Sequence, residues 1–194
     1  NFIQLLGTPR FVLPMLIQGV TFIILFSYIS ASPFITQHIY GMSPQQFSIM
    51  FAVVGISLIV SSQLTGKLVD FINRQMLLRI LTLIQLVGIL SVTFTLVNHL
   101  SIWILCFGFI ILVAPVTGVA TLGFSIAMDE RTGGNGSASS LLGLIQYLLG
   151  GVISPLVGLM GEENYVPYVT IILIAGILLI VLQVMSYFVF RTSK

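Results

Sequence analysis

The chain has 194 residues, of which 57% are hydrophobic and only 6% are Asp, Glu, Lys or Arg, and its net charge is +2. An ordinary soluble domain carries about 25% charged residues, so this composition excludes a water-soluble fold and makes a lipid bilayer the solvent. The small, dispersed positive charge excludes a nucleic-acid-binding surface, and the single cysteine, Cys106, excludes a disulfide framework or a cysteine metal site.

Uncharged runs of about 20 residues, the length needed to cross the hydrocarbon core, recur along the chain. The first run is predicted to end at Ser32-Pro33, and the second to begin after residues 41–44. The predicted spans, which together make a bundle over residues 11–190, are 11–31, 47–66, 78–97, 102–126, 138–160 and 168–190. The third and sixth spans are nearly all aliphatic, so we expect them to face lipid.

The basic residues test this count independently, because they concentrate on the cytoplasmic side of membrane proteins. All seven fall before the first span, after the sixth, or at the second-to-third and fourth-to-fifth junctions; they are Arg10, Lys67, Arg74, Arg79, Arg131, Arg191 and Lys194. The opposite connections hold only His38, His99, Glu162 and Glu163, and we interpret the two histidines as interfacial loop residues. Both termini are therefore predicted to be cytoplasmic. Because the first residue is Asn1 rather than Met, we also expect sequence upstream of it.

An internal repeat appears when the sequence is shifted by 92 residues. Residues 62–70 then align with residues 154–162 in the pattern S-x-L-x-G-x-(L/M)-x-(D/E), and Val60 meets Val152. The repeating unit holds three helices, and since three is odd, the second copy must cross the membrane in the opposite direction. The predicted fold class is an all-α membrane protein whose six transmembrane helices form a 3+3 inverted repeat.

Polar and aromatic side chains on the first and fifth spans recur at helical spacing. Small residues at every third or fourth position of the fifth span favour close helix packing, but a buried amide such as Gln146 needs a hydrogen-bonding partner. The predicted substrate-path residues are Gln18, Phe22, Phe26, Phe51, Gln146 and Tyr147. In the fourth span, Pro115 and Gly118 predict a helix break, because proline removes a backbone hydrogen bond.

Residues 66–74, G-K-L-V-D-F-I-N-R, resemble the G-x-L-x-D-x-x-G-R signature of the major facilitator superfamily, with Asn73 in place of the second glycine. The segment lies between the second and third spans, where the carboxy-terminal copy of that signature is expected. The resemblance implies that Gly66, Asp70 and Arg74 form a conformational switch. We expect Asp70 to pair with Arg74 or to lie against a helix amino terminus.

Two further segments, residues 28–43 and 136–146, resemble drug:proton antiporters of the bicyclomycin-resistance (Bcr/CflA) type. This resemblance implies the carboxy-terminal half of a twelve-helix exporter of amphipathic small molecules in the bacterial plasma membrane. Residues 1–10 would then be the end of the central cytoplasmic linker, and residues 191–194 a cytoplasmic tail. No span has a carboxylate near its middle, so proton coupling is expected in the amino-terminal half. No cofactor or metal is predicted.

Two other classes of function are alternatives. Gly123-Phe124-Ser125 is superficially similar to the nucleophile segment of an intramembrane serine protease, but both histidines lie on the other side of the membrane, which excludes an enzyme of this type. A self-standing half-size transporter or membrane scaffold that works as a homodimer stays open.

Overall fold

The computed structural model describes residues 2–161 and 163–192. Within these residues, six helices are long and apolar enough to cross a membrane, which confirms the predicted number. The elements are α1 (Phe2–Leu6), α2 (Pro9–Phe34), η1 (Ile35–Ile39), α3 (Pro44–Leu68), α4 (Arg74–Val97), α5 (Ile102–Val113), α6 (Val116–Asp129), α7 (Asn135–Ile153), η2 (Ser154–Gly158) and α8 (Val166–Arg191). The chain therefore folds as a multi-pass membrane bundle.

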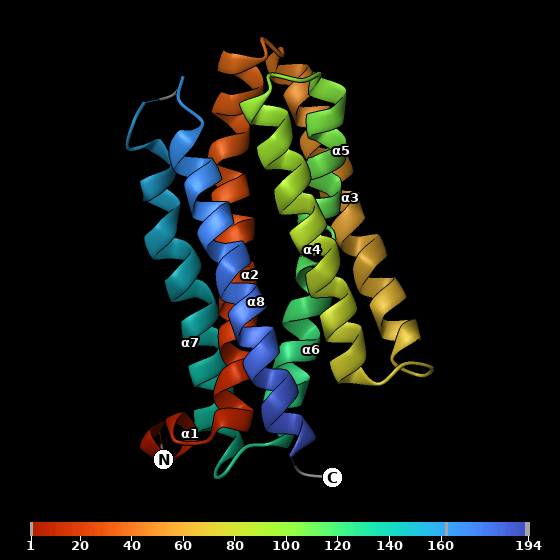
Figure 1. Cartoon of the computed structure of the whole chain (residues 1–194), viewed down its shortest axis with the longest axis vertical. Helices are drawn as coiled ribbons and strands as arrows, with labels where there is room; N and C mark the ends of the chain where they lie inside the picture. The colour runs from red at the N-terminus through yellow and green to blue at the C-terminus, as the bar shows by residue number, and fades with distance from the viewer. Residues whose placement is uncertain (1, 162, 193–194) are drawn as a thin grey trace.

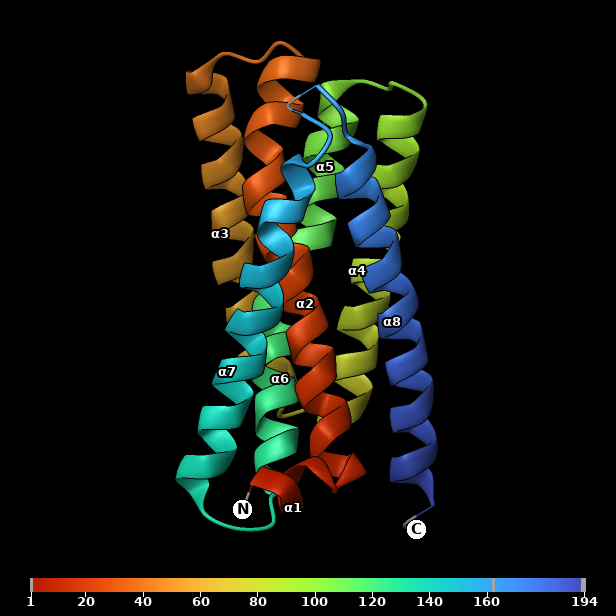
Figure 2. The ribbon, with the colours of Figure 1, turned by 90° about the vertical axis from the view of Figure 1, so that its left-hand side faces the viewer.

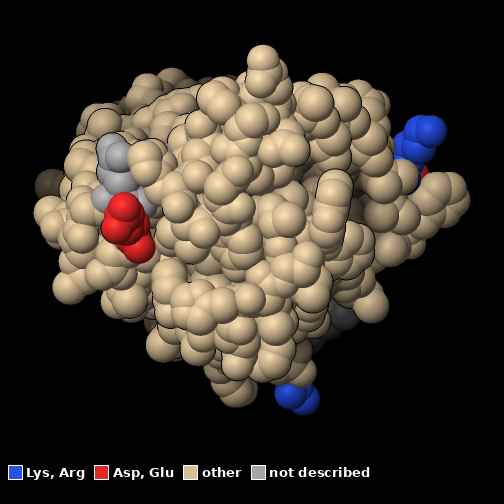
Figure 3. Space-filling model, turned by 90° about the horizontal axis from the view of Figure 1, so that it is seen from above, with Lys and Arg blue, Asp and Glu red and all other residues tan. Residues whose placement is uncertain are grey.

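The long helices run up and down the bundle, and both ends of the chain lie at the same end of it (Figure 1). Arg10 and Arg74 stand in the first turns of their helices at that end, Arg79 in the second turn of α4, and Lys67 and Arg191 in the last turns of their helices. Seen from the opposite end, the surface carries basic side chains only at its edge (Figure 3). Glu162 and Lys194 lie outside the described residues.

Packing between the helices follows the two triplets of the inverted repeat. The first helix, α2, packs along α6, α7 and α8, so it contacts every helix of the second triplet. Conversely, the broken helix formed by α5 and α6 packs along α3 and α4 of the first triplet. Each triplet thus places its leading helix against the second and third helices of the other, with α2 running through the middle of the bundle (Figure 2).

The prediction that the first span ends at residue 31 is wrong. The chain stays α-helical through Pro33 to Phe34 and then continues as the π-helical turn η1. A proline removes one backbone hydrogen bond, and in lipid the freed group is often satisfied by a side chain or a wider turn. Just after Pro33, the π-helical turn η1 widens the helix, and within it the Thr36 hydroxyl donates to the Ser32 carbonyl over 2.7 Å.

Helix α3 begins at Pro44, three residues before the predicted start of the second span, because Ser43 and Gln46 form a capping box. Near the amino terminus, residues 1–10 are not wholly a linker. Phe2–Leu6 form α1, which packs against α2 and α7, and α2 already begins at Pro9.

Helix α5 ends at Val113 and α6 begins at Val116, so the fourth span is interrupted around Pro115. One turn later, Gly118 lies where three helices meet. A Cβ at Gly118 would approach Thr65 Oγ1 of α3 to 2.5 Å and Leu81 Cδ1 of α4 to 2.7 Å. The missing side chain therefore lets α3 and α4 close on the interrupted helix.

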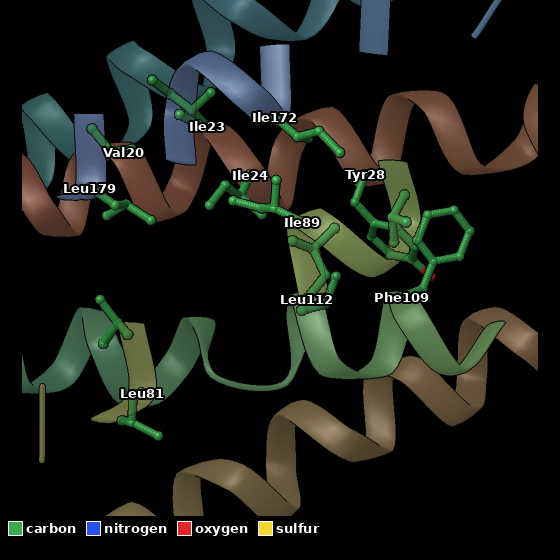
Figure 4. Packing of buried hydrophobic residues seen from close by; sticks show 14 of the residues in the cluster. Val20, Ile23, Ile24, Tyr28, Leu81, Ile89, Phe109, Leu112, Ile172 and Leu179 are labelled. Carbon is green, nitrogen blue, oxygen red and sulfur yellow. The ribbon is translucent and has the colours of Figure 1, made fainter. Parts of the chain in front are cut away.

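The backbones of α4 and α5 approach each other closely at a glycine. Ile24, Ile89 and Leu112 point toward one another at the junction of α2, α4 and α5 (Figure 4), and all three are buried. A Cβ built on Gly88 would lie only 2.5 Å from the Cα and the N of Leu112. The two backbones touch there because Gly88 has no side chain.

Buried hydrogen bonds tie the helices together inside this apolar packing. Thr21 of α2 donates to Gln85 Oε1 of α4 over 2.8 Å, and Gln183 of α8 donates to Thr82 of α4 over 2.9 Å. The aliphatic composition of the third span suggested that it faces lipid, but one side of α4 is buried in the bundle. Its exposed side carries Leu83, Val87 and Leu90, while Thr82 and Gln85 are buried.

Candidate functional site

Five of the six predicted substrate-path residues meet where α2 packs against α7. Glycines make the close approach possible on both helices. A Cβ at Gly19 would lie 2.6 Å from Leu149 Cδ1, and a Cβ at Gly150 would collide with the ring of Phe26. Farther along the same contact, the hydroxyls of Ser30 and Ser154 hydrogen-bond to each other. Gly150 and Ser154 of the fifth span therefore serve packing, as small residues do in lipid, whereas a Cβ at Gly143 or Gly158 would meet nothing within 4 Å.

Two amides form the polar part of this contact. Gln18 is fully buried, and its Nε2 atom donates to the Leu142 carbonyl over 3.3 Å and to Gln146 Oε1 over 2.5 Å. Gln146 itself is half-buried. Gln18 thus lies behind Gln146 rather than at the surface, and its partners are on α7.

Three aromatic rings adjoin the amide pair. The ring centroids lie 5.8 Å apart for Phe22 and Tyr147, 6.5 Å for Phe26 and Tyr147, and 6.1 Å for Phe22 and Phe26. These edge-on and tilted distances are typical of favourable aromatic pairs. Tyr147 is 62% exposed, so the cluster is open on one side. We call Gln18, Phe22, Phe26, Gln146 and Tyr147 the amide–aromatic patch.

Phe51 is not part of this patch. It lies on α3 and stacks on Tyr28, with centroids 5.8 Å apart and ring planes within 8° of parallel. Phe47 on one side and Phe109 beyond Tyr28 extend this second aromatic cluster. Phe51 was predicted as a path residue from its aromatic side chain alone. In the structure the packing of α3 places it against Tyr28, outside the amide–aromatic patch.

The expected pairing of Asp70 with Arg74 is wrong. Arg74 Nη2 lies 2.5 Å from Asp129 Oδ2, and its Nη1 atom donates to Ser125 Oγ over 2.6 Å. Both partners belong to α6, so Arg74 joins the start of α4 to the end of α6. Within the described residues, no hydrogen bond or ion pair of the Asp70 side chain is found.

Asn73, the residue that departs from the signature, caps α4. Its Oδ1 atom accepts from the Gln75 amide over 2.9 Å, and its φ of −56° needs no left-handed backbone. Gly66 and Arg74 line one cavity of about 420 Å³ between α3 and α6, together with Thr65, Thr121 and Ser125. The signature therefore surrounds a space at the end of the bundle that carries the termini.

Ser125 accepts its hydrogen bond from a guanidinium, which cannot act as a general base, so the arrangement does not activate a nucleophile. His99 lies at the other end of the bundle, with its ring 6.0 Å from that of Tyr165. Among the described residues, no group of three His, Cys, Asp or Glu side chains could hold a metal ion.

Six membrane-length helices in two interlocked triplets, with an aromatic and amide surface on the central helix, define a helical bundle of the secondary-transporter class. Comparison with known families gives the particular one. The family model described as Major Facilitator Superfamily matches residues 2–155, and the chain belongs to this superfamily of transporters, which are not enzymes.

Two curated relatives are similar to the chain. An uncharacterized MFS-type transporter of Bacillus subtilis, YdgK, is 35% identical over 153 residues, which cover 79% of this chain and 38% of the relative. A bicyclomycin resistance protein homolog of Haemophilus influenzae is 25% identical over 170 residues, which cover 88% of this chain and 42% of the relative. The chain thus spans about two fifths of the length of the relatives it matches.

Proposed function

We propose that this chain forms the carboxy-terminal half of a proton-coupled multidrug exporter that works by alternating access in the plasma membrane, with both termini cytoplasmic. The amide–aromatic patch is the observation that carries the proposal. Its rings suit an amphipathic small molecule, and its amides suit a substrate with a few hydrogen-bonding groups. The similarity to a protein named for bicyclomycin resistance supports the drug class.

Proton coupling is assigned to another part of the transporter. Among the described acidic residues, Asp129 is the last residue of α6, and Asp70, Glu130 and Glu163 lie in connections. A proton carrier needs an ionisable group within the membrane. The partner that supplies it is the amino-terminal half, which also completes the cavity.

A homodimer of half-size bundles is the second candidate. Little of α3 is buried within the bundle, although α3 is long and apolar. Such a helix needs a second bundle or lipid against it. In a homodimer, the second bundle would be another copy of this chain. In the first proposal, it would be the amino-terminal half of the transporter.

Transport by reconstituted protein distinguishes the two proposals. Protein expressed from the intact gene is placed in liposomes with an acidic interior, and uptake of ethidium or a similar amphipathic dye is followed. We expect gradient-driven uptake that a protonophore abolishes. Residues 1–194 alone should give no such uptake, because one bundle supplies only one wall of the path.

Protonophore-sensitive uptake by residues 1–194 alone would contradict the half-transporter proposal and establish the homodimer. Absence of gradient-driven uptake by the intact gene product, across a panel of amphipathic dyes and antibiotics, would contradict drug export itself.

A further inference from the structure

A backbone carbonyl sets the orientation of the amide pair in the patch. The Leu142 oxygen can only accept, so the atom of Gln18 that faces it at 3.3 Å must be the donor Nε2. The same Nε2 atom lies 2.5 Å from Gln146, so the atom of Gln146 at that contact must be the acceptor Oε1. Turning either amide over would place two donors or two acceptors face to face, which costs free energy in a buried site.

This orientation leaves one free donor on the patch. With Oε1 of Gln146 directed at Gln18, its Nε2 atom has no hydrogen-bond partner among the described residues and is not enclosed. Next in the chain is Tyr147, which is largely exposed and contacts Phe22. The amide therefore offers an N–H group beside open aromatic faces.

Few charges lie on the two helices that form the patch. In α2 the only charged residue is Arg10, in the first turn, and α7 has none. A ligand on the patch therefore meets no acid or base of these helices, and the groups that recognise it are the Gln146 amide and the aromatic rings.

We propose that Nε2 of Gln146 donates a hydrogen bond that selects ligands with an acceptor, such as a carbonyl oxygen, next to an aromatic ring. Gln18 is a positioning residue, because it holds Gln146 by its Oε1 atom. The proposal rests on the proposed function, since it takes the patch as a wall of the substrate path, and it adds the chemical group that the path selects.

Prodan tests the proposal, because its carbonyl sits on a naphthalene ring and its emission shifts to longer wavelength when that carbonyl accepts a hydrogen bond. Its partner probe is the analogue in which a propyl group replaces the propionyl group. Both dyes are titrated into the protein expressed from the intact gene, held in lipid nanodiscs. One neutral hydrogen bond changes affinity by roughly twofold to tenfold, and we expect prodan to bind more tightly by such a factor.

Gln146→Leu should remove the preference and shift bound prodan to shorter wavelength, while binding of the propyl analogue stays unchanged. Gln18→Leu should reduce the preference in part, because Gln146 is then free to rotate. The matched control is Gln45→Leu, the same change at an exposed position of α3, and it should leave both dyes unaffected.

Equal affinity of the wild type for the two dyes, or equal loss of both in Gln146→Leu, would overturn the acceptor preference and leave the substrate path standing. Binding of neither dye would overturn the path and this inference together. If Gln18→Leu does not fold, the spectral shift in Gln146→Leu decides alone.

Discussion

Replacing Arg74 by alanine should slow transport several-fold while the protein still folds and binds its substrate. Arg74 joins the start of α4 to the end of α6 through Asp129 and Ser125, and thus ties one helix triplet to the other. Both ion-pair partners are about half exposed, so their contribution to folding stability is only about 0–1 kcal/mol. A bias of about 1.4 kcal/mol between two transport conformations nevertheless changes their ratio tenfold.

The initial rate of dye uptake into proteoliposomes measures this effect, and we expect a fall of up to about fivefold, which corresponds to about 1 kcal/mol. Asp129→Asn should act in the same direction, and exchanging the two residues, Arg74→Asp with Asp129→Arg, should restore part of the rate. Arg191→Ala is the control, because the hydrogen bond and the ring contact that Arg191 makes with Tyr187 stay within one helix, α8. Wild-type transport by Arg74→Ala would refute the switch assignment.

Gly88→Ala should prevent the bundle from closing. The added Cβ would lie 2.5 Å from two backbone atoms of Leu112, and backbone cannot move aside as a flexible side chain can. Overpacking of a core costs about 1–3 kcal/mol, and contact with backbone places this variant at or above the upper end. The yield of monodisperse protein and its melting temperature in detergent should therefore both fall.

The control for Gly88 is Gly55→Ala, because Gly55 is also in the middle of a spanning helix but its added Cβ meets nothing within 4 Å. This variant should melt at or slightly above the wild-type temperature, since alanine favours the helix over glycine. Equal melting temperatures for Gly88→Ala and Gly55→Ala would show that α4 and α5 are not packed as described.

Hydropathy and the placement of basic residues predicted six helices and a shared side for both termini, because lipid leaves a chain few alternatives to spanning helices. The prediction that the first span ends before Pro33 was wrong. Proline often ends helices in water, but in this bundle α2 continues through Pro33 to Phe34 and into the π-helical turn η1. Local sequence does not reveal which prolines a helix continues through.

The residues of the site could be predicted from the sequence where they recur at helical spacing. Gln18, Phe22 and Phe26 repeat every four residues on α2, so their shared face follows from periodicity, and Gly150 of α7 packs against that face at Phe26. Contacts between distant segments gave no such signal. The Arg74–Asp129 pair joins residues 55 positions apart, and Gln85 is buried within an otherwise aliphatic helix. The position of Phe51 depends on how α3 packs against α5 and α6, which brings its ring onto Tyr28.

Thiol labelling of the patch tests most directly that α2 and α7 form a wall of the substrate path. In a Cys106→Ser background of the protein expressed from the intact gene, Gln146→Cys and Leu148→Cys are treated with a water-soluble maleimide, with and without a transported dye. Leu148 lies two residues from Gln146 in the chain and is 49% exposed, whereas Gln146 is half-buried. Exposure in the isolated bundle therefore does not by itself predict faster labelling at position 146. We predict fast labelling at position 146 that the dye suppresses, and slow labelling at position 148. Labelling at 146 that is no faster than at 148, or that the dye does not change, would contradict the account.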